Sequence, residues 1–201
     1  MSIDHNDLPS DLPTDREASD AHSEPRRQRL PGDLEPAALL DRIIRVDQAG
    51  EYGAKRIYEG QMAVLGPDPQ LKHMAEQERR HLQRFDELIV ERHARPTLLQ
   101  PFWHVAGFAL GAATAMLGRE AAMACTVAVE EVIDEHYRQQ AAKLPPEEAP
   151  LKAEIEAFRK EELEHRAIGL AEGAERAPAY SALTAAVKSG SRLAIWLAER
   201  F

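Results

Sequence analysis

Two Glu-x-x-His tetrads are the residues of this chain best suited to chemistry: Glu78 with His81, and Glu162 with His165. Residues three apart lie on one face of an α-helix, so the carboxylate and the imidazole of each tetrad can reach the same metal ion. Oxygen and nitrogen donors without thiolates suit iron or manganese better than a structural zinc cluster. Such ions do redox chemistry with oxygen that no ordinary side chain can do.

One further glutamate precedes each tetrad in a helical segment, Glu51 before the first and Glu130 before the second, at similar intervals. Four carboxylates and two imidazoles in this order form the ligand set of a dinuclear carboxylate site inside a four-helix bundle. The negative charges of the four carboxylates would offset most of the positive charge of two divalent ions. The predicted ligands are Glu51, Glu78, His81, Glu130, Glu162 and His165.

The same residues also fit a plainer interpretation. Both tetrads lie in charge-rich runs, which usually form solvated helix faces with i,i+4 pairs. Glu130 taken alone fits a capping or surface role. Glu51 lies between Gly50 and Gly53. Glycines inside a helix lower its stability, and from the sequence these two bring no gain in packing. The joint order of all four groups favours the metal site over coincidence.

A tyrosine follows each single glutamate after two turns of helix, Tyr58 after Glu51 and Tyr137 after Glu130. Each tyrosine is expected near the face of its own glutamate, either packed in the core or lining a substrate cavity and relaying protons or electrons. His136 is adjacent to Tyr137 and is a candidate for the same delivery role.

Four other polar residues have predicted roles outside the ligand set. Asp47 and Asp134 each lie one turn from a single glutamate, so either could accept a hydrogen bond from the N–H of a ligand histidine. His104 is not expected to bind metal. Cys125, the only cysteine, is expected to be a small buried packing residue.

Helices must position these side chains, because helical patterns occupy the chain from Glu35 onward and no alternating strand pattern appears. Short connections place neighbouring helices antiparallel, so we predict an all-α, four-helix bundle with additional apolar and C-terminal helices. Expected helices run from Pro36 to Leu65, from Pro69 until Pro96, from Phe102 to Gln140, from Glu148 to Gly173, and from Pro178 to the end.

The composition of the N-terminal region differs from that of the rest of the chain. Residues 1–33 are acidic and rich in Ser and Pro, which predicts a disordered tail, and residues 34–201 form the predicted helical domain. The net charge of −9 argues against binding to nucleic acid, and a single cysteine excludes an intrachain disulfide. The tail lacks the features of a transit peptide or a secretion signal, so a cytoplasmic location is expected.

Three segments carry a resemblance to a known family: Arg45-Val46-Asp47-Gln48-Ala49-Gly50-Glu51-Tyr52-Gly53-Ala54, Ala124-Cys125-Thr126-Val127-Ala128-Val129-Glu130-Glu131 and Glu161-Glu162-Leu163-Glu164-His165. The chain from about residue 36 to 201 resembles the demethoxyubiquinone hydroxylases of ubiquinone biosynthesis, a branch of the ferritin-like di-iron proteins. The resemblance implies that the six predicted ligands bind two iron ions. It also implies hydroxylation of the benzoquinone ring of a polyprenyl demethoxyubiquinone with O2.

The resemblance further implies an external reductant, NADH, and a lipid-binding partner protein that presents the quinone at a membrane. Neither a Gly-x-Gly-x-x-Gly fingerprint nor a Cys-x-x-Cys pair is present to indicate a flavin domain or a redox dithiol. A homo-oligomer is left open. Two rival functions share the bundle: a ferritin-like iron oxidase or store, and a carrier of quinone or lipid without catalysis.

The apolar stretch from Leu98 to Leu117 is too short and interrupted for a clean membrane span. It is either a bundle helix packed closely through Gly107 and Gly111 or an interfacial surface near a quinone entrance. We expect peripheral attachment to the cytoplasmic face of the cell membrane. The apolar residues of this surface would be Phe102, Trp103, Phe108, Leu193, Ile195, Trp196, Leu197 and Phe201.

Overall fold

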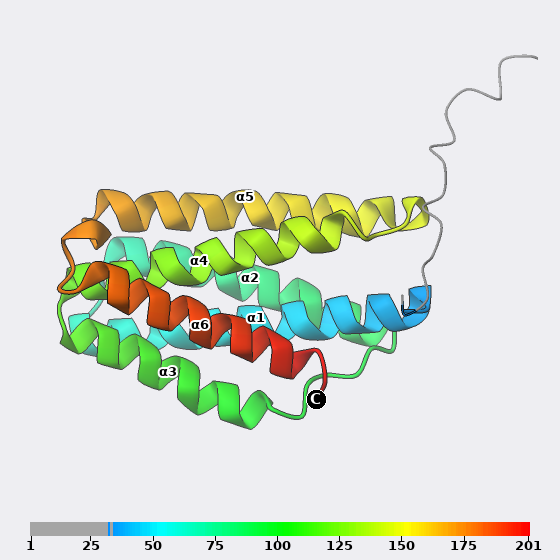
Figure 1. Cartoon of the computed structure of the whole chain (residues 1–201), viewed down its shortest axis with the longest axis horizontal. Helices are drawn as coiled ribbons and strands as arrows, with labels where there is room; N and C mark the ends of the chain where they lie inside the picture. Colours follow the sequence, from blue (N-terminus) through cyan, green and yellow to red (C-terminus); the bar gives the residue numbers. More distant parts are fainter. Residues whose placement is uncertain (1–31, 33) are drawn as a thin grey trace, which may run out of the picture. The chain divides into compact units, whose positions relative to one another are not determined.

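The computed structural model describes residue 32 and residues 34–201, so the predicted tail of residues 1–33 lies outside the described residues apart from Gly32. The described part of the chain is helical and contains no strand, which confirms the all-α prediction (Figure 1). Its α-helices are α1 (Pro36–Leu65), α2 (Pro69–Glu91), α3 (Gln100–Met116), α4 (Arg119–Ala141), α5 (Ala149–Ala171) and α6 (Tyr180–Ala198). The short 3-10 helices Pro146–Glu148 and Ala174–Arg176 precede and follow α5.

Helices α1, α2, α4 and α5 form a four-helix bundle, and α3 and α6 lie outside it (Figure 1). Helix α3 packs along α1 and α6 packs along α4, whereas no Cα atom of α3 lies within 8 Å of a Cα atom of α6. A ferritin-like bundle with an added apolar helix and a C-terminal helix is therefore confirmed.

Local signals explain where the first two helices begin and end. Helix α1 has the predicted bounds and ends before Gly66, whose φ of 80° favours glycine. The Asp68 carboxylate then caps α2 by accepting hydrogen bonds from the backbone N–H groups of Gln70 and Leu71 at 3.0 and 3.1 Å. Helix α2 ends at Glu91, before the predicted limit at Pro96, because His93 adopts a left-handed conformation with φ 53°.

The prediction of one helix from Phe102 to Gln140 is wrong. The chain breaks at Gly118, which has φ 114°, and this conformation separates α3 from α4. The break lies where the nearly all-apolar half of the segment gives way to its amphipathic half. Helix α4 can thereby enter the bundle while α3 stays outside it.

Glycines bring α1 and α3 into backbone contact. A Cβ atom added at Gly111 would clash with the carbonyl oxygen of Ile57, and one added at Gly60 would clash with that of Phe108. A Cβ atom at Gly107 would lie 2.9 Å from the carbonyl oxygen of Gly53. The prediction of close packing through Gly107 and Gly111 is confirmed.

Apolar clusters occupy the bundle core on both sides of the predicted ligands. One cluster contains Ile44 of α1 and Phe85 of α2, and the other contains Leu71 and Met74 of α2. Along α2 the ligands at 78 and 81 fall between these clusters, so the site lies in the middle of the bundle with apolar packing on each side. Cys125 is fully buried in a third cluster, as predicted.

Candidate metal centre

The six predicted ligands lie together in the bundle core. Each is at most 1% exposed to solvent. Their donor atoms form two groups, each with all atoms within 4.8 Å of one another. The first group is Glu51, Glu78, His81 and Glu162, and the second is Glu78, Glu130, Glu162 and His165. Glu78 and Glu162 belong to both groups, which makes them the candidates for bridging two ions.

Both imidazoles direct Nδ1 toward the carboxylates. Nδ1 of His81 lies 3.0 Å from Oε1 of Glu162 and 3.4 Å from Oε2 of Glu51. Nδ1 of His165 lies 3.2 Å from Oε2 of Glu162 and 3.2 Å from Oε1 of Glu78. The helical spacing of each tetrad therefore delivers one nitrogen and one carboxylate to the same place.

Unpaired polar atoms converge at this centre. Both oxygens of Glu78 and of Glu162, Oε2 of Glu51 and Glu130, and Nδ1 of both histidines are buried and make no hydrogen bond. A buried polar atom without a partner is costly, so such a concentration of orphaned donors to metal indicates a ligand. Oxygen and nitrogen atoms in two overlapping groups fit a pair of ions such as iron or manganese.

The buried carboxyl and imidazole groups of the centre differ in how their pKa values are shifted. Burial and the charge of Glu162 raise the pKa of Glu130 to about 8, and burial with the same neighbour raises the pKa of Glu78 well above its usual value. Burial opposes ionisation of Glu162, but the close His165 and His81 imidazoles outweigh it and lower its pKa to about 2. Burial also opposes charging of His81, yet contacts with Glu162 and Glu51 raise its pKa to about 11. Protons thus hold positions that metal ions would take.

The two tyrosines reach across the bundle. Tyr58 on α1 donates a hydrogen bond to Oε1 of Glu130 on α4 at 2.7 Å, and Tyr137 on α4 donates to Oε1 of Glu51 on α1. Each was expected beside the glutamate of its own helix, but each bonds the glutamate of the other one. Burial and then the neighbouring carboxylates raise both phenol pKa values, so both tyrosines remain donors.

The outer nitrogens of the histidines have partners that the sequence did not indicate. Nε2 of His165 bonds Oε1 of Gln77 at 2.9 Å, and Nε2 of His81 bonds Oε2 of Glu161 at 3.2 Å. Gln77 and Glu161 each directly precede a tetrad glutamate, and this shared position is the only signal that could have found them.

The prediction that Asp47 or Asp134 accepts these hydrogen bonds is wrong. Asp47 accepts a hydrogen bond from Gln140 at 2.7 Å, and Asp134 accepts one from Arg159 at 2.6 Å. Both aspartates lie one turn from a single glutamate, but the histidines present their outer nitrogens to α2 and α5 instead.

His136 lies near the centre without belonging to it. Its Nε2 lies 2.8 Å from the amide nitrogen of Gln140 and 3.7 Å from Oδ1 of Asp47. Burial lowers the pKa of His136 to about 4, so the imidazole is neutral at neutral pH. His104 lies elsewhere, where its Nδ1 is 2.6 Å from the hydroxyl of Tyr52.

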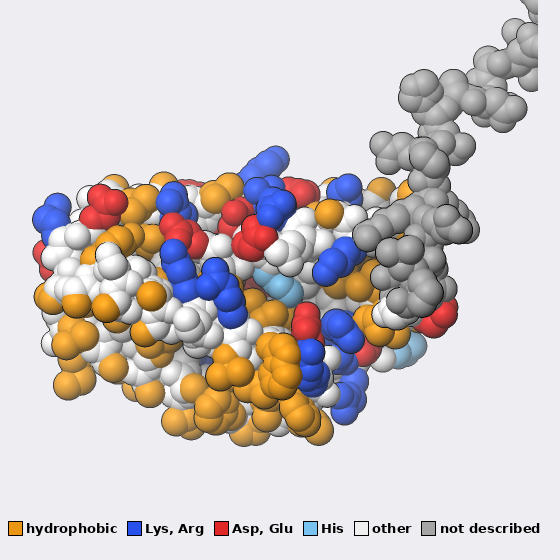
Figure 2. All heavy atoms as spheres, in the orientation of Figure 1, with side chains coloured by type: hydrophobic (Ala, Val, Ile, Leu, Met, Phe, Trp, Pro, Cys, Tyr) orange, Lys and Arg blue, Asp and Glu red, His pale blue; other side chains and the backbone are white. Residues whose placement is uncertain are grey.

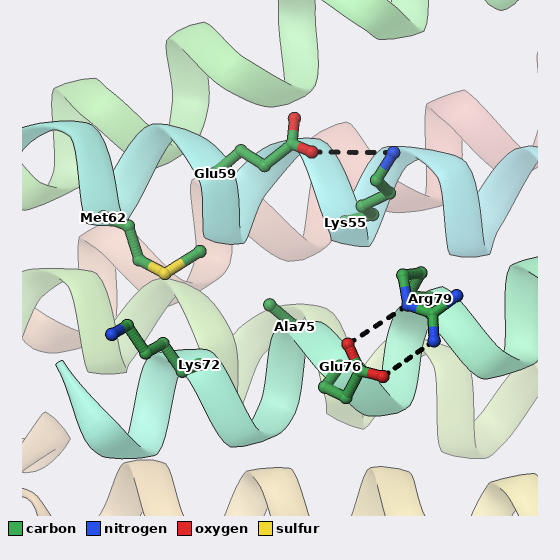
Figure 3. A pocket seen from close by; sticks show the side chains of 7 residues that line it. All are labelled: Lys55, Glu59, Met62, Lys72, Ala75, Glu76 and Arg79. Atoms are coloured by element: carbon green, nitrogen blue, oxygen red, sulfur yellow. Dashed lines mark hydrogen bonds and ion pairs between the residues drawn. The ribbon is translucent and has the colours of Figure 1, made fainter. Parts of the chain in front are cut away.

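Two hollows differ in character. A surface hollow of about 480 Å³ lies between α1 and α2 and is lined mostly by charged side chains that pair with one another (Figure 3). None of the six ligands lines it. A second space, too narrow to hold water, lies beside Glu130 between α1 and α4. The surface hollow is lined by Lys55, Glu59, Met62, Lys72, Ala75, Glu76 and Arg79, and the narrow space by Ala54, Ile57, Tyr58, Thr126, Val129 and Glu130.

The family model described as "Ubiquinone biosynthesis protein COQ7" matches residues 38–198. This match covers most of the chain and includes all six ligand positions. The chain belongs to this family. The resemblance stated from the sequence motifs is therefore confirmed.

Curated members of the family are similar over most of their length. The 3-demethoxyubiquinol 3-hydroxylase of Rhodospirillum rubrum is 61% identical over 176 residues, which cover 86% of this chain and 83% of the relative. The mitochondrial NADPH-dependent 3-demethoxyubiquinone 3-hydroxylase of Homo sapiens is 57% identical over 171 residues, 81% of this chain and 78% of the relative. The mitochondrial 5-demethoxyubiquinone hydroxylase of Saccharomyces cerevisiae is 40% identical over 219 residues, 99% of this chain and 88% of the relative.

Proposed function

We propose that this protein is a di-iron monooxygenase that hydroxylates the ring of a polyprenyl demethoxyubiquinone in ubiquinone biosynthesis. The observation that carries the proposal is the convergence of unpaired, buried donor atoms from all six predicted ligands in a member of this hydroxylase family. The names of its relatives give the substrate class and the type of reaction, a hydroxylation.

The reaction replaces a ring C–H by C–OH. One atom of O2 enters the ring and the other leaves as water, which requires two electrons and two protons from outside. Bound iron ions would supply the activation of O2 that side chains lack. The resemblance implies NADH as the reductant, and the name of the human relative gives NADPH, so we propose a reduced nicotinamide dinucleotide.

The protein holds the carboxylates and keeps the centre dry. Hydrogen bonds from Tyr58 and Tyr137 orient Glu130 and Glu51, and each leaves the second carboxylate oxygen free for an ion. The apolar clusters on either side exclude water, which strengthens electrostatic interactions within the site. We therefore assign the tyrosines first to positioning the ligands.

Proton delivery is the role we propose for His136. It is partly exposed, and it lies 3.7 Å from the buried Asp47, which is one turn from Glu51. Burial raises the pKa of Asp47 well above its usual value, which favours the protonated form of this carboxyl. Asp47 with His136 thus forms a polar connection from the surface toward the ligand Glu51.

Exposed apolar side chains gather on α3 and the end of α6, and we propose that they contact the membrane. Figure 2 shows hydrophobic side chains massed along the lower edge of the molecule, where these helices lie. Phe102 is 58% exposed, and Trp196 carries the Arg200 guanidinium over its ring at 4.0 Å, an arrangement suited to lipid headgroups. Trp103 and Phe108 are partly buried. The exposed members of this face are Leu98, Phe102, Val105, Leu193, Trp196 and Phe201.

None of the helices within the described residues is long and apolar enough to cross a membrane. We propose peripheral attachment to the cytoplasmic face of the cell membrane, with a lipid-binding partner protein that presents the quinone. If detergent alone released the protein, after high-salt and carbonate washes had failed, peripheral attachment would be contradicted.

A packed apolar cluster lies beside the centre, between α3 and α6. Leu110 of α3 and Leu183 and Val187 of α6 cover Ile57 and Val129, which line the narrow space beside Glu130. No Cα atom of α3 lies within 8 Å of a Cα atom of α6, so side chains fill the space between these two helices. We propose that the quinone ring enters between these helices, and the charged hollow between α1 and α2 does not suit it (Figure 3).

A single-turnover experiment tests the proposed function. Iron-loaded, chemically reduced protein is mixed with a short-chain demethoxyubiquinone, in its quinone or quinol form, and with ¹⁸O₂. We expect a product whose ring carries one labelled oxygen atom, measured by mass spectrometry. Rapid oxidation of the iron with no labelled quinone would instead support the ferritin-like iron oxidase.

The variant Glu130→Ala separates catalysis from carriage. It removes one predicted ligand, so we expect loss of bound iron and of hydroxylation, with binding to lipid vesicles unchanged. A protein that carried quinone without catalysis would show no labelled product either before or after the substitution.

A further inference from the structure

The two predicted metal positions differ in the groups behind their histidines. Gln77 and Glu161 occupy equivalent places, each directly before a tetrad glutamate. Each reaches across to the other tetrad, Gln77 on α2 to His165 on α5 and Glu161 on α5 to His81 on α2. The geometry is reciprocal, but one partner is an amide and the other is a carboxylate.

Both outer partners act as acceptors. Each histidine directs Nδ1 at the ligand carboxylates, and a nitrogen that binds metal must be unprotonated, so Nε2 carries the hydrogen. That hydrogen is donated to an amide oxygen at His165 and to a carboxylate oxygen at His81. A carboxylate behind a ligand imidazole makes the imidazole a more basic ligand, and a neutral amide does so less.

The two outer partners also differ in their surroundings. Gln77 is 5% exposed, whereas the Glu161 side chain is 32% exposed and its Oε2 also accepts a hydrogen bond from Arg80 at 3.0 Å. Arg80 fixes the carboxylate that faces His81. The imidazole of His81 also stacks on Phe158 with ring centroids 4.1 Å apart.

We propose that Glu161 makes the two ions of the centre inequivalent, with the ion at Glu51 and His81 held more strongly in its oxidised state. The ion at Glu130 and His165, which has the amide behind it, would then be reduced first. Glu161 and Gln77 are positioning residues that act through the histidines. This inference rests on the proposed di-iron function and adds an order to the two reductions.

Exchange of the two outer partners tests the inference. Glu161→Gln gives both histidines an amide, Gln77→Glu gives both a carboxylate, and the double variant restores one of each with the sides reversed. The protein is loaded with ⁵⁷Fe, and iron content, Mössbauer spectra and the two reduction midpoints are measured. We expect two distinct quadrupole doublets in the original protein and a gap between midpoints that falls by at least half in either single variant.

The double variant distinguishes an electronic effect from structural damage. If the outer partners set the inequivalence, the gap between midpoints returns in the double variant. If the substitutions merely loosen the site, losses in the single variants add together and the gap does not return. That second outcome would overturn the inference.

Glu164→Gln is the matched control. Glu164 lies on α5 three residues after Glu161, is exposed, and pairs with His73 at 3.5 Å instead of with a ligand. The same loss of charge there should leave spectra and midpoints unchanged, so an effect as large as that of Glu161→Gln would overturn the inference. Two bound irons with equivalent spectra would overturn the inference alone, whereas absence of bound iron would overturn the proposed function as well.

Discussion

Tyr58 of α1 donates a hydrogen bond to Glu130 of α4 at 2.7 Å, so a ligand carboxylate on one helix is held by a phenol on another. Tyr137 makes the reciprocal bond to Glu51. Neither bond is required by the helical spacing, which places each tyrosine above the glutamate of its own helix. The pairing ties α1 to α4 at the level of the metal centre.

Removal of the first of these hydroxyls should weaken the centre. In Tyr58→Phe, Oε1 of Glu130 stays buried but loses its donor. We expect a loss of about 1 to 3 kcal/mol in the free energy of unfolding of the metal-free protein, as is usual when a buried acceptor loses its hydrogen-bond donor. Urea unfolding measures this loss, and iron content per chain should fall with it.

The control is Tyr180→Phe in α6. Tyr180 is partly buried against the cluster around Met74, and its hydroxyl makes no hydrogen bond to the described chain. This variant should unfold like the original protein. Equal destabilisation by both substitutions would show that the bond between Tyr58 and Glu130 contributes nothing specific.

Metal loading should release protons. In the metal-free protein at neutral pH, His81 is charged because its pKa is about 11, and Glu130 is protonated because its pKa is about 8. Ligands must lose these protons to bind metal, so affinity should rise as the pH rises from neutrality through about 8. Calorimetric titration in two buffers that differ in ionisation enthalpy measures the number released, and a binding heat independent of the buffer would contradict the prediction.

The contact between α1 and α3 should not tolerate a methyl group. Gly111→Ala places a Cβ atom against the carbonyl oxygen of Ile57, and backbone cannot rotate away as a side chain could. We expect a loss of about 1 to 3 kcal/mol in the free energy of unfolding, typical of overpacking. Gly190→Ala in α6 is the matched control, because a Cβ atom there has nothing within 4 Å and should stabilise the helix by about 0.5 to 1 kcal/mol.

A charge on the exposed apolar face should weaken membrane binding. Burial of a phenylalanine side chain is worth about 1.5 to 3 kcal/mol, so Phe102→Glu should lower affinity for lipid vesicles roughly tenfold or more. Sedimentation with vesicles measures this affinity. Val90→Glu makes the same charge change on α2 at a residue that is 73% exposed, and iron content should be unchanged in both variants. Equal loss of binding in the two would contradict the assignment of the face to α3 and α6.

The ligand set could be predicted from the chain because helical periodicity alone brings Glu78 to His81 and Glu162 to His165. The order of the four ligand-bearing helical segments along the chain then indicates a four-helix bundle. The bounds of α1 followed from Pro36 and Gly66, which act locally. Signals that lie within one turn of helix were therefore sufficient for most of the architecture.

Contacts between helices could not be predicted in the same way. Whether His81 presents its outer nitrogen to Asp47 or to Glu161 depends on how α2 rotates against α5, which no local pattern encodes. The helix break at Gly118 was also missed, because the sequence does not show that a glycine within a run of helix formers has a positive φ. The close packing at Gly107 and Gly111 was predicted correctly because two glycines one turn apart on an apolar helix indicate a face that a neighbouring backbone can approach.

The reciprocal bonds have a consequence for ancestry. The half of the chain with α1 and α2 carries a glutamate, a tyrosine, an outer partner and a tetrad, and the half with α4 and α5 carries the same four elements in the same order. Each tyrosine and each outer partner serves the opposite half. A two-helix unit would thus complete the whole set by pairing with its own copy, so a duplicated half-chain inherits a working centre at once. In a chain of such origin, Gln77 and Glu161 would mark a difference between the two copies.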